Sequence, residues 1–396
     1  MKVLLAHNFY RSTAPSGEDS VYRSEKKLLE RYAEVIPFEK FNDDIDDRTL
    51  SSKVRIAIDS VWSKHIYDEL TKLIVAKKPD IAHFHNTFPQ LSGSVYAACH
   101  DNGVPVVQTL HNFRSICANA LLLRDGKPCL DCVNGNLVPA LIHRCYRGSF
   151  AATAAQVMTI QSNRWRGAYV SGVDRYIALT NFAAEILIEG GLPRDRIEIK
   201  GNFVSRPSIK GAGDGNYVLF IGRLSEEKGV RILIEAWKYV RDVSLKIVGD
   251  GALMQELQSL AASVSDNIEF LGLRSHDEVL ELLGHALVMV MPSIWYETFG
   301  MVAIESFSVG TPVLASAIGG LNEVVEDGIT GLKFEPGNPK DLAEKLISLL
   351  NNRGGLVNLR KSTLAVFEEK YTAEKNIEDI LMIYNKCMSL YNSSKL

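Results

Sequence analysis

Short apolar, β-branched runs alternate with helical patterns along the whole chain, and they fall into two separate series. Unbroken apolar runs of this length are typical of parallel strands that helices cover on both faces. Strands that alternate with helices build an open parallel sheet. The sequence therefore predicts an α/β chain with one parallel sheet for each series.

The two series define the expected domains. Strands of the first series are expected at 2–8, 81–86, 104–112, 175–180 and 197–204, and those of the second at 217–223, 244–250, 268–273, 286–293, 311–316 and 331–335. The segment 208–216 holds three glycines in nine residues, so it is expected to be a linker. A length of 396 residues also favours two domains.

We expect two Rossmann-like domains, 1–205 and 216–375, with ligand bound in the crevice between their strand ends. An amphipathic helix at 376–396 is expected to pack back on the first domain.

Composition excludes several classes of protein. No run approaches the ~18 apolar residues of a spanning helix, and "MKVLLAHNFY" is too short and polar for a signal peptide. We therefore expect a cytoplasmic protein. A net charge of −3 provides no general attraction to nucleic acid, so no nucleic-acid partner is expected. Residues 111–175 nevertheless hold eight basic against three acidic side chains, which favours phosphate or an anionic membrane as a local partner.

Two loops of the second series carry side chains suited to a diphosphate. Arg223 follows a strand in "FIGRLSEEKG", and Lys228 precedes the next helix. Gly222 belongs to the same turn, and "IVGDGALMQ" provides a further strand-to-helix turn with Gly249, Asp250 and Gly251. The motif GxGxxG is incomplete, because Met254 stands at its third glycine, and no GxxxxGK[ST] occurs. A nicotinamide site and a P-loop are therefore disfavoured, whereas one arginine and one lysine near one sheet edge suit a diphosphate.

The segment "YETFGMVAIES" places two carboxylates eight positions apart. Glu297 is expected in a loop ahead of a helix that begins near Gly300, and Glu305 about two turns further along. Carboxylates bind vicinal hydroxyls, and free N–H groups at 299–301 bind anions or hydroxyls. Two polyols, such as a sugar and a ribose, are one interpretation, and ordinary helix-end or surface charges are the other. A glycosidase is disfavoured, because its two carboxyls must flank one bond about 5–10 Å apart.

Taken together, "RLSEEKG", "VGDG" and the E-x7-E pattern resemble family 4 of the retaining GT-B glycosyltransferases over residues 217–350. The resemblance implies a GT-B fold, with an acceptor-side domain at 1–205 and a nucleotide-sugar-binding domain at 216–375. It implies transfer of a hexose-type sugar, with retention, from a nucleoside-diphosphate sugar to a saccharide or lipid-linked saccharide in surface polysaccharide biosynthesis. No metal cofactor is implied for catalysis.

The resemblance also implies roles for single residues. Arg223 and Lys228 would hold the donor diphosphate, and Glu305 the ribose. The donor sugar would be bound by Glu297 with the backbone of Thr298, Phe299, Gly300 and Met301. His111, after the strand 104–112, would lie near the reaction centre, which gives a catalytic set of His111, Arg223, Lys228 and Glu297. Gly17 would belong to a loop near the phosphates, although Ser16 departs from the family pattern there.

A cysteine cluster lies in the first domain, in an insertion at 113–150. Cys117, Cys129, Cys132 and Cys145 have the spacing C-x11-C-x2-C-x12-C, which is compatible with a structural zinc site of four thiolates. Reduced thiols and a disulfide pair are the alternatives, and a cytosolic location argues against the pair. The family resemblance does not include this cluster.

Two other functions are compatible with the same motifs. A nucleotide-sugar epimerase of GT-B fold would need no acceptor, and a non-catalytic sugar-nucleotide-binding protein would lack the phosphate-holding pair. If the chain is a transferase with a lipid-linked acceptor, the basic stretch 111–175 would contact the inner face of an anionic membrane.

Overall fold

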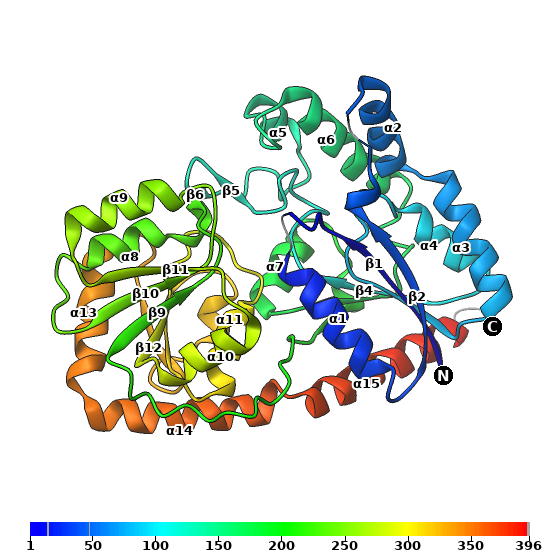
Figure 1. Cartoon of the computed structure of the whole chain (residues 1–396). Coiled ribbons are helices and arrows are strands. Elements are labelled where there is room, and N and C mark those ends of the chain that lie inside the picture. Colours follow the sequence, from blue (N-terminus) through cyan, green and yellow to red (C-terminus); the bar gives the residue numbers. More distant parts are fainter. Residues whose placement is uncertain (14–15, 47, 394–396) are drawn as a thin grey trace. The chain divides into compact units, whose positions relative to one another are not determined.

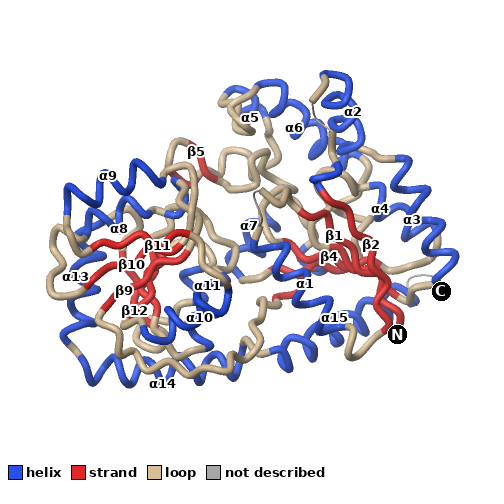
Figure 2. Tube along the Cα trace, in the orientation of Figure 1, coloured by secondary structure: helices blue, strands red, loops and turns tan. Residues whose placement is uncertain are grey.

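The computed structural model describes residues 1–13, 16–46 and 48–393 of the chain. It divides into two compact units, one formed by 1–122, 129–201 and the segment from Asn376, and the other by 123–128 and 202–375. Each unit contains a six-stranded sheet covered by helices (Figures 1 and 2). The predicted α/β class with two Rossmann-like halves is confirmed. No helix of the described residues is both long and apolar enough to cross a bilayer.

The sheet of the first unit is parallel throughout. Its strands, in spatial order, are β2 (Glu34–Phe41), β1 (Lys2–Phe9), β3 (Ile81–Phe84), β4 (Val106–Leu110), β7 (Arg175–Ala178) and β8 (Ile197–Ile199). The strands β3 and β4 end earlier than predicted. The chain leaves the sheet at His85 and at His111, so these side chains sit beyond its carboxyl edge.

The edge strand β2 was missed in the sequence analysis. Ile36 and Phe38 are its only buried residues, and the others are partly or fully exposed, as in a strand at the edge of a sheet. Pro37 lies opposite Leu5 of β1, and a proline is tolerated there because β2 has no neighbour on its other side. The unbroken apolar pattern used to find the central strands therefore does not apply to it.

The helices of the first unit flank this sheet. They are α1 (Gly17–Leu29), α2 (Leu50–Val61), α3 (Lys64–Lys77), α4 (Ser94–Asp101), α5 (Val138–Ile142), α6 (Phe150–Trp165), α7 (Asn181–Glu189) and α15 (Ala373–Ser393). The last helix begins three residues before the predicted start. Its residues from Asn376 onward belong to the first unit, where the Tyr384 hydroxyl lies 2.7 Å from Nδ1 of His83.

The second unit repeats this architecture. Its parallel strands, in spatial order, are β11 (Ile268–Gly272), β10 (Ser244–Val248), β9 (Tyr217–Ile221), β12 (Val288–Met291), β13 (Val313–Ser316) and β14 (Gly331–Phe334). Its helices are α8 (Val230–Ala236), α9 (Met254–Val264), α10 (His276–His285), α11 (Met301–Ser308), α12 (Leu321–Val324), α13 (Pro339–Asn351) and α14 (Arg353–Lys370). A short antiparallel hairpin joins β5 (Leu123–Arg124) to β6 (Lys127–Pro128).

The glycine-rich segment 208–216 is held against the second unit. The N–H of Gly211 donates to the carbonyl of Val309, and that of Gly213 to the carbonyl of Gly284. A Cβ on Gly211 would come within 2.6 Å of both of these carbonyl oxygens. Glycine is therefore needed here for close packing, in addition to any freedom it gives a linker.

Candidate active site

Three loops of the second unit meet at the carboxyl edge of its sheet. They follow β9, β10 and β12, which are neighbours in the order β10-β9-β12. The first loop carries Lys228 in a 3-10 turn, the second carries Gly249–Gly251, and the third carries Glu297 ahead of α11. Since parallel strands end at one edge of a sheet, side chains distant in sequence come together there.

Glycines allow these loops to approach one another. Gly229 has φ +66°, and a Cβ on it would come within 1.9 Å of the Pro292 carbonyl oxygen. Gly249 has φ +135°, and its Cβ would reach the Gly222 carbonyl oxygen at 1.9 Å. The N–H of Ile294 donates to the carbonyl of Glu227 at 3.0 Å, which joins the loop after β12 to the Lys228 turn.

Lys228 and Glu297 form a close ion pair. Nζ of Lys228 lies 2.5 Å from Oε1 of Glu297, and Oγ of Ser293 donates to the same oxygen at 3.0 Å. Glu297 is only 6% exposed. Burial alone would raise the pKa of Glu297, but the Lys228 ammonium and the Ser293 hydroxyl hold it below its usual value. The structure thus contains an ionised carboxylate and an ammonium at the sheet edge.

The backbone beside Glu297 is fixed by two further glycines. The N–H of Gly320 donates to the Glu297 carbonyl at 2.7 Å, and a Cβ on Gly320 would come within 2.6 Å of the Thr298 carbonyl oxygen. Gly300 has φ +97° and caps α11, where a Cβ would meet Leu321 at 2.6 Å. Phe299 is buried, and Met301 is the first residue of the helix.

Glu305 lies within α11 and differs from Glu297 in its surroundings. Burial raises the pKa of Glu305 to about 7. Within the described part of the chain, its carboxylate makes no hydrogen bond or ion pair. A carboxylate held without a partner in a poorly solvated place is unstable unless a ligand supplies donors.

The other predicted donor-site residues lie at the places expected from their strands. Arg223 is exposed directly after β9, and Oδ1 of Asp250 accepts from the N–H of Gly251 at 2.7 Å. Gly251 is required by packing, since a Cβ there would approach the Leu224 carbonyl oxygen to 2.4 Å. Gly17 lies in the first unit as the first residue of α1, with open space around its Cβ position. Ser16 caps that helix by accepting from the N–H of Glu18.

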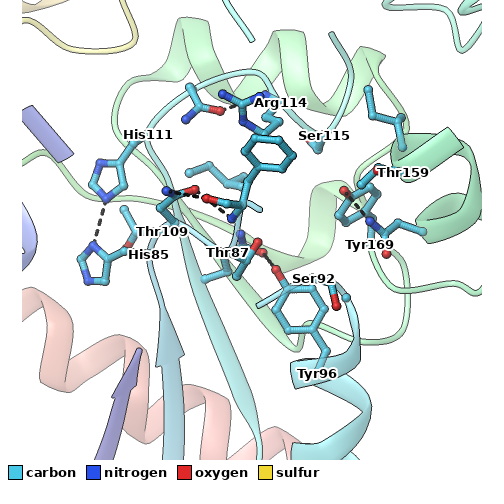
Figure 3. A pocket seen from close by; sticks show the side chains of 18 of the residues that line it. His85, Thr87, Ser92, Tyr96, Thr109, His111, Arg114, Ser115, Thr159 and Tyr169 are labelled. Atoms are coloured by element: carbon cyan, nitrogen blue, oxygen red, sulfur yellow. Dashed lines mark hydrogen bonds between the residues drawn. The ribbon is translucent and has the colours of Figure 1, made fainter. Parts of the chain in front are cut away.

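In the first unit, His111 belongs to a chain of buried polar groups. Nε2 of His111 lies 2.9 Å from Nδ1 of His85, and the planes of the two rings are nearly parallel, with their edges facing one another (Figure 3). Nε2 of His85 lies 3.0 Å from Oε1 of Glu25, whose second oxygen pairs with Nζ of Lys200 at 3.3 Å. Glu25 is 1% and Lys200 3% exposed. Burial opposes ionisation of Glu25, but Lys200 and His85 hold its pKa well below the usual value.

This arrangement sets the tautomers of both histidines. An ionised carboxylate only accepts hydrogen bonds, so the Nε2 of His85 must carry the proton. We assign Nδ1 of His85 as the acceptor and Nε2–H of His111 as the donor in the bond between the two rings. Burial, together with the neighbouring His85, holds the pKa of His111 well below its ordinary value, so His111 is neutral. Its Nδ1 therefore carries the lone pair and acts as an acceptor.

A third histidine completes the cluster. His83 is bonded through Nδ1 to the Tyr384 hydroxyl at 2.7 Å and through Nε2 to Oγ1 of Thr109 at 2.8 Å. Glu25, His83 and His85 have ligand atoms within 4.8 Å of one another, as metal ligands would. The Lys200 ammonium already neutralises Glu25, and the ring nitrogens of both histidines are engaged in hydrogen bonds. We therefore interpret the cluster as a hydrogen-bonded network.

The four cysteines of the insertion are free thiols in the structure. Burial raises the pKa of Cys132 to about 11, and the neighbouring Cys117, Cys145 and Cys129 thiols contribute to this rise. Cys132 and Cys145 pack in a small apolar cluster with residues of α5 and α6. Among the described residues, the four sulfurs do not meet the 4.8 Å spacing that the histidine cluster meets. The zinc site stays a prediction.

Two family descriptions match the chain over adjoining ranges. Residues 54–206 match "Glycosyltransferase Family 4", and residues 204–364 match "Glycosyl transferases group 1". An uncharacterized glycosyltransferase of Methanocaldococcus jannaschii is 31% identical over 79% of this chain and 77% of its own length. The chain belongs to glycosyltransferase family 4. A D-inositol 3-phosphate glycosyltransferase of Catenulispora acidiphila is 28% identical to this family 4 enzyme, over 72% of this chain and 67% of that one.

Solved structures agree with the family assignment at the level of the fold. Anabaena HepE in complex with UDP superposes on this family 4 glycosyltransferase with a TM-score of 0.69, at 16% identity over 98% of this chain and 100% of HepE. Sucrose-phosphate synthase from Thermosynechococcus elongatus also has a TM-score of 0.69, at 17% identity and with 98% and 100% of the two chains covered. These neighbours show that the glycosyltransferase has the GT-B fold.

Several residues that shape the site were missed in the sequence analysis. Glu25, His85 and Lys200 were not singled out, and neither was the glycine pair 319–320. The pairing of His85 with His111 could have been predicted from the sequence, because "HFHN" at 83–86 and "TLHN" at 109–112 both place His-Asn just beyond a strand. No sequence pattern marks Glu25 as a buried residue, since an acidic residue on an amphipathic helix is usually exposed.

Proposed function

We propose that this glycosyltransferase moves a hexose from a nucleoside-diphosphate sugar to a hydroxyl of a saccharide or lipid-linked saccharide, with retention of configuration. The observation that carries the proposal is the ion pair between the half-buried Lys228 and the buried Glu297 at the carboxyl edge of the second sheet. An ammonium suits the donor diphosphate, and an adjacent carboxylate suits hydroxyls of the sugar attached to it. HepE, which shares the fold, has been crystallised with UDP and with UDP-glucose.

Different groups of the second unit would bind different parts of the donor. Lys228 and Arg223 would hold the diphosphate, and the N–H groups at the start of α11 would bind donor hydroxyls or charge. Glu297 would accept from hydroxyls of the transferred sugar, and Glu305 from the ribose. The partnerless carboxylate of Glu305 supports this, because ribose hydroxyls are the donors that it lacks.

In the transfer step, the acceptor hydroxyl oxygen would bond to the anomeric carbon on the face that the phosphate leaves. The bond between that carbon and the phosphate oxygen would break with both electrons going to the oxygen. The acceptor's proton would pass to the departing phosphate. Lys228 and Arg223 would stabilise the charge that develops on the diphosphate, and neutral His111 would accept a hydrogen bond from a sugar hydroxyl.

A panel of nucleotide sugars, beginning with UDP-glucose, tests this proposal. A nucleotide that binds the folded protein raises its melting temperature. We expect such a shift and, with a saccharide acceptor, release of nucleoside diphosphate and a product of retained anomeric configuration. Conversion of donor alone to an epimer would favour the epimerase, and binding without turnover on any acceptor would favour a binding protein.

The raised pKa of Glu305 predicts a pH dependence of nucleotide binding. Ribose hydroxyls donate best to the ionised carboxylate, which prevails above pH 7 and is lost below it. Affinity should therefore rise about tenfold between pH 6 and pH 8. The Glu305→Gln variant should bind the nucleotide more weakly, and its affinity should not rise with pH in this way. Any pH dependence that remains in the variant comes from ionisation of the nucleotide's phosphate and can be subtracted. Calorimetric titration at three pH values measures both, and an equal slope in wild type and variant would remove Glu305 from the site.

A membrane-facing surface would suit a lipid-linked acceptor. Large apolar side chains are exposed on α2, α5 and α6, which pack together in the first unit (Figure 1). They include Ile142, 69% exposed, and Trp165, 81% exposed, and Arg144 and Arg166 each lie within two residues of one of them. Apolar and basic residues on one surface are typical of helices that lie on anionic lipid.

We expect flotation with phosphatidylglycerol vesicles and little with phosphatidylcholine vesicles. An Ile142→Ser and Trp165→Ser double variant should lower the bound fraction at least about tenfold, since each buried side chain contributes about 1.5–3 kcal/mol. Leu273→Ser is the matched control, because Leu273 is 72% exposed on the second unit. Equal loss in the control would argue against this surface.

A further inference from the structure

A polar pocket opens beside His111 in the first unit and is not used by the donor. It lies beyond the carboxyl ends of β3 and β4 and reaches inward to α4 and α6. In Figure 3, His85 and His111 form one wall, Thr159 and Tyr169 lie opposite, Arg114 is at one end and Tyr96 at the other. We call this cavity of about 60 Å³ the Arg114 pocket.

The Arg114 pocket gathers buried polar atoms that have no partner among the described residues. They are Nε and Nη1 of Arg114, Oγ of Ser115 and Oδ1 of Asn163. Ser115 is 8% and Asn163 3% exposed, so water does not readily satisfy them. A buried polar atom without a partner destabilises the folded state, because it has lost its hydrogen bonds to water. Four such atoms in one cavity therefore point to a ligand that supplies their partners.

The charge of Arg114 specifies the ligand further. Its guanidinium lies 4.3 Å from the centre of the Phe88 ring and shares a hydrogen bond with the Tyr10 hydroxyl. Its charge also opposes the rise that burial causes in the pKa of Glu18. The acidic group of the pocket, Glu18, already accepts from Asn112 at 2.6 Å and from the Tyr10 hydroxyl at 3.3 Å. Nε and Nη1 of Arg114 still have no acceptor among the described residues, and the oxygens of one anionic group can accept from both.

The size of the pocket limits what can enter. A buried water occupies about 10–15 Å³ by the same measure, so the cavity holds the equivalent of only a few waters. A whole hexose would not fit, but a carboxylate or one phosphate group would. Asn163 Oδ1 is an acceptor, so it suits a hydroxyl hydrogen of the same molecule.

We propose that the Arg114 pocket binds an anionic group, a carboxylate or a phosphate, carried by the acceptor. Arg114 supplies the charge and two N–H donors, and the Ser115 hydroxyl supplies a further donor. The acceptor hydroxyl that receives the sugar then lies on the His111 side of this group. The assignment to the acceptor rests on the proposed function, whereas the anion site itself rests on the pocket alone.

Three probes test the proposal by calorimetry on the full chain: glucuronate, inorganic phosphate and uncharged methyl glucoside. At least one anion should bind about tenfold or more tightly than methyl glucoside, as expected for a charge-assisted contact. Arg114→Gln should abolish this preference when it is combined with Lys228→Ala, which removes the ammonium of the proposed diphosphate site as a second place for phosphate. Ser115→Ala should weaken it about three- to tenfold, as expected for one lost hydrogen bond, and provides a second test if Arg114→Gln does not fold. Preference for glucuronate indicates an acidic sugar, and preference for phosphate indicates a phosphorylated or lipid-phosphate acceptor.

Two control variants test whether other basic side chains of the protein bind the anionic probes. Arg166→Gln removes an arginine that packs over Trp62, outside the pocket, and Lys228→Ala removes the ammonium of the second unit. Both should keep the anion preference. Equal binding of all three probes, anion binding that survives Arg114→Gln in the Lys228→Ala background, or loss of the anion preference in Lys228→Ala alone would each overturn the proposal. A wild type that binds anions in the pocket but no nucleotide would contradict the proposed transferase function and leave the anion site intact.

Discussion

The Lys228→Ala variant should lose at least about a hundredfold in kcat/KM for sugar transfer, the usual cost of removing one preorganised group that stabilises transition-state charge. Two effects combine in this loss. The diphosphate loses an ammonium, and Glu297 loses the counter-ion that lies 2.5 Å from its Oε1. Burial then opposes ionisation with less compensation, so the pKa of Glu297 rises. A protonated Glu297 binds donor hydroxyls less well.

Initial rates over a range of donor concentrations measure this loss. Lys238→Ala is the matched control, because Lys238 is exposed just after α8 and should transfer sugar at the wild-type rate. In a double-mutant cycle, Lys228→Ala combined with Glu297→Gln should be little worse than Lys228→Ala alone, since the two side chains act as one unit. Additive losses would mean that the pair does not work together, and a wild-type rate in Lys228→Ala would remove it from the active site.

The positions of Lys228 and Glu297 at one sheet edge could be predicted because both residues follow apolar strands. Lys228 and Glu297 each come shortly after an apolar strand, and parallel strands bring their following loops to one edge. Their direct contact was not predictable. It depends on Gly229, whose positive φ and lack of a Cβ let the lysine turn approach Pro292. That requirement is visible only in three dimensions.

The buried polar network of the first unit was less predictable because its partners are far apart in the chain. His83 and Tyr384 are separated by 301 positions and meet only after the C-terminal helix joins the first unit. Glu25 and Lys200 are separated by 175 positions, and each resembles an exposed surface charge in the sequence. Local patterns predict which face of an element is apolar, but they do not show which buried polar groups satisfy one another.

The Glu25→Gln variant should be less stable by about 3 kcal/mol, the lower end of the range for breaking a buried ion pair. Lys200 is 3% exposed and would lose the carboxylate that lies 3.3 Å away. The same change should also slow sugar transfer at least about tenfold, because it moves the protons on the rings of His85 and His111. A glutamine N–H donating to His85 would reverse the tautomer of His85 and then that of His111. Chemical denaturation measures the first effect and steady-state kinetics the second.

Combining Glu25→Gln with Lys200→Met separates these effects. A neutral methionine removes the uncompensated charge, and replacing a buried ion pair by apolar residues is often neutral or stabilising. The double variant should therefore recover most of the lost stability, while its transfer rate stays low. The ¹⁵N shifts of the His111 ring should report the reversed tautomer in both variants. If the rate returned together with stability, Glu25 would only support the fold, because a positioning role through His85 requires the rate to stay low when the charge is balanced.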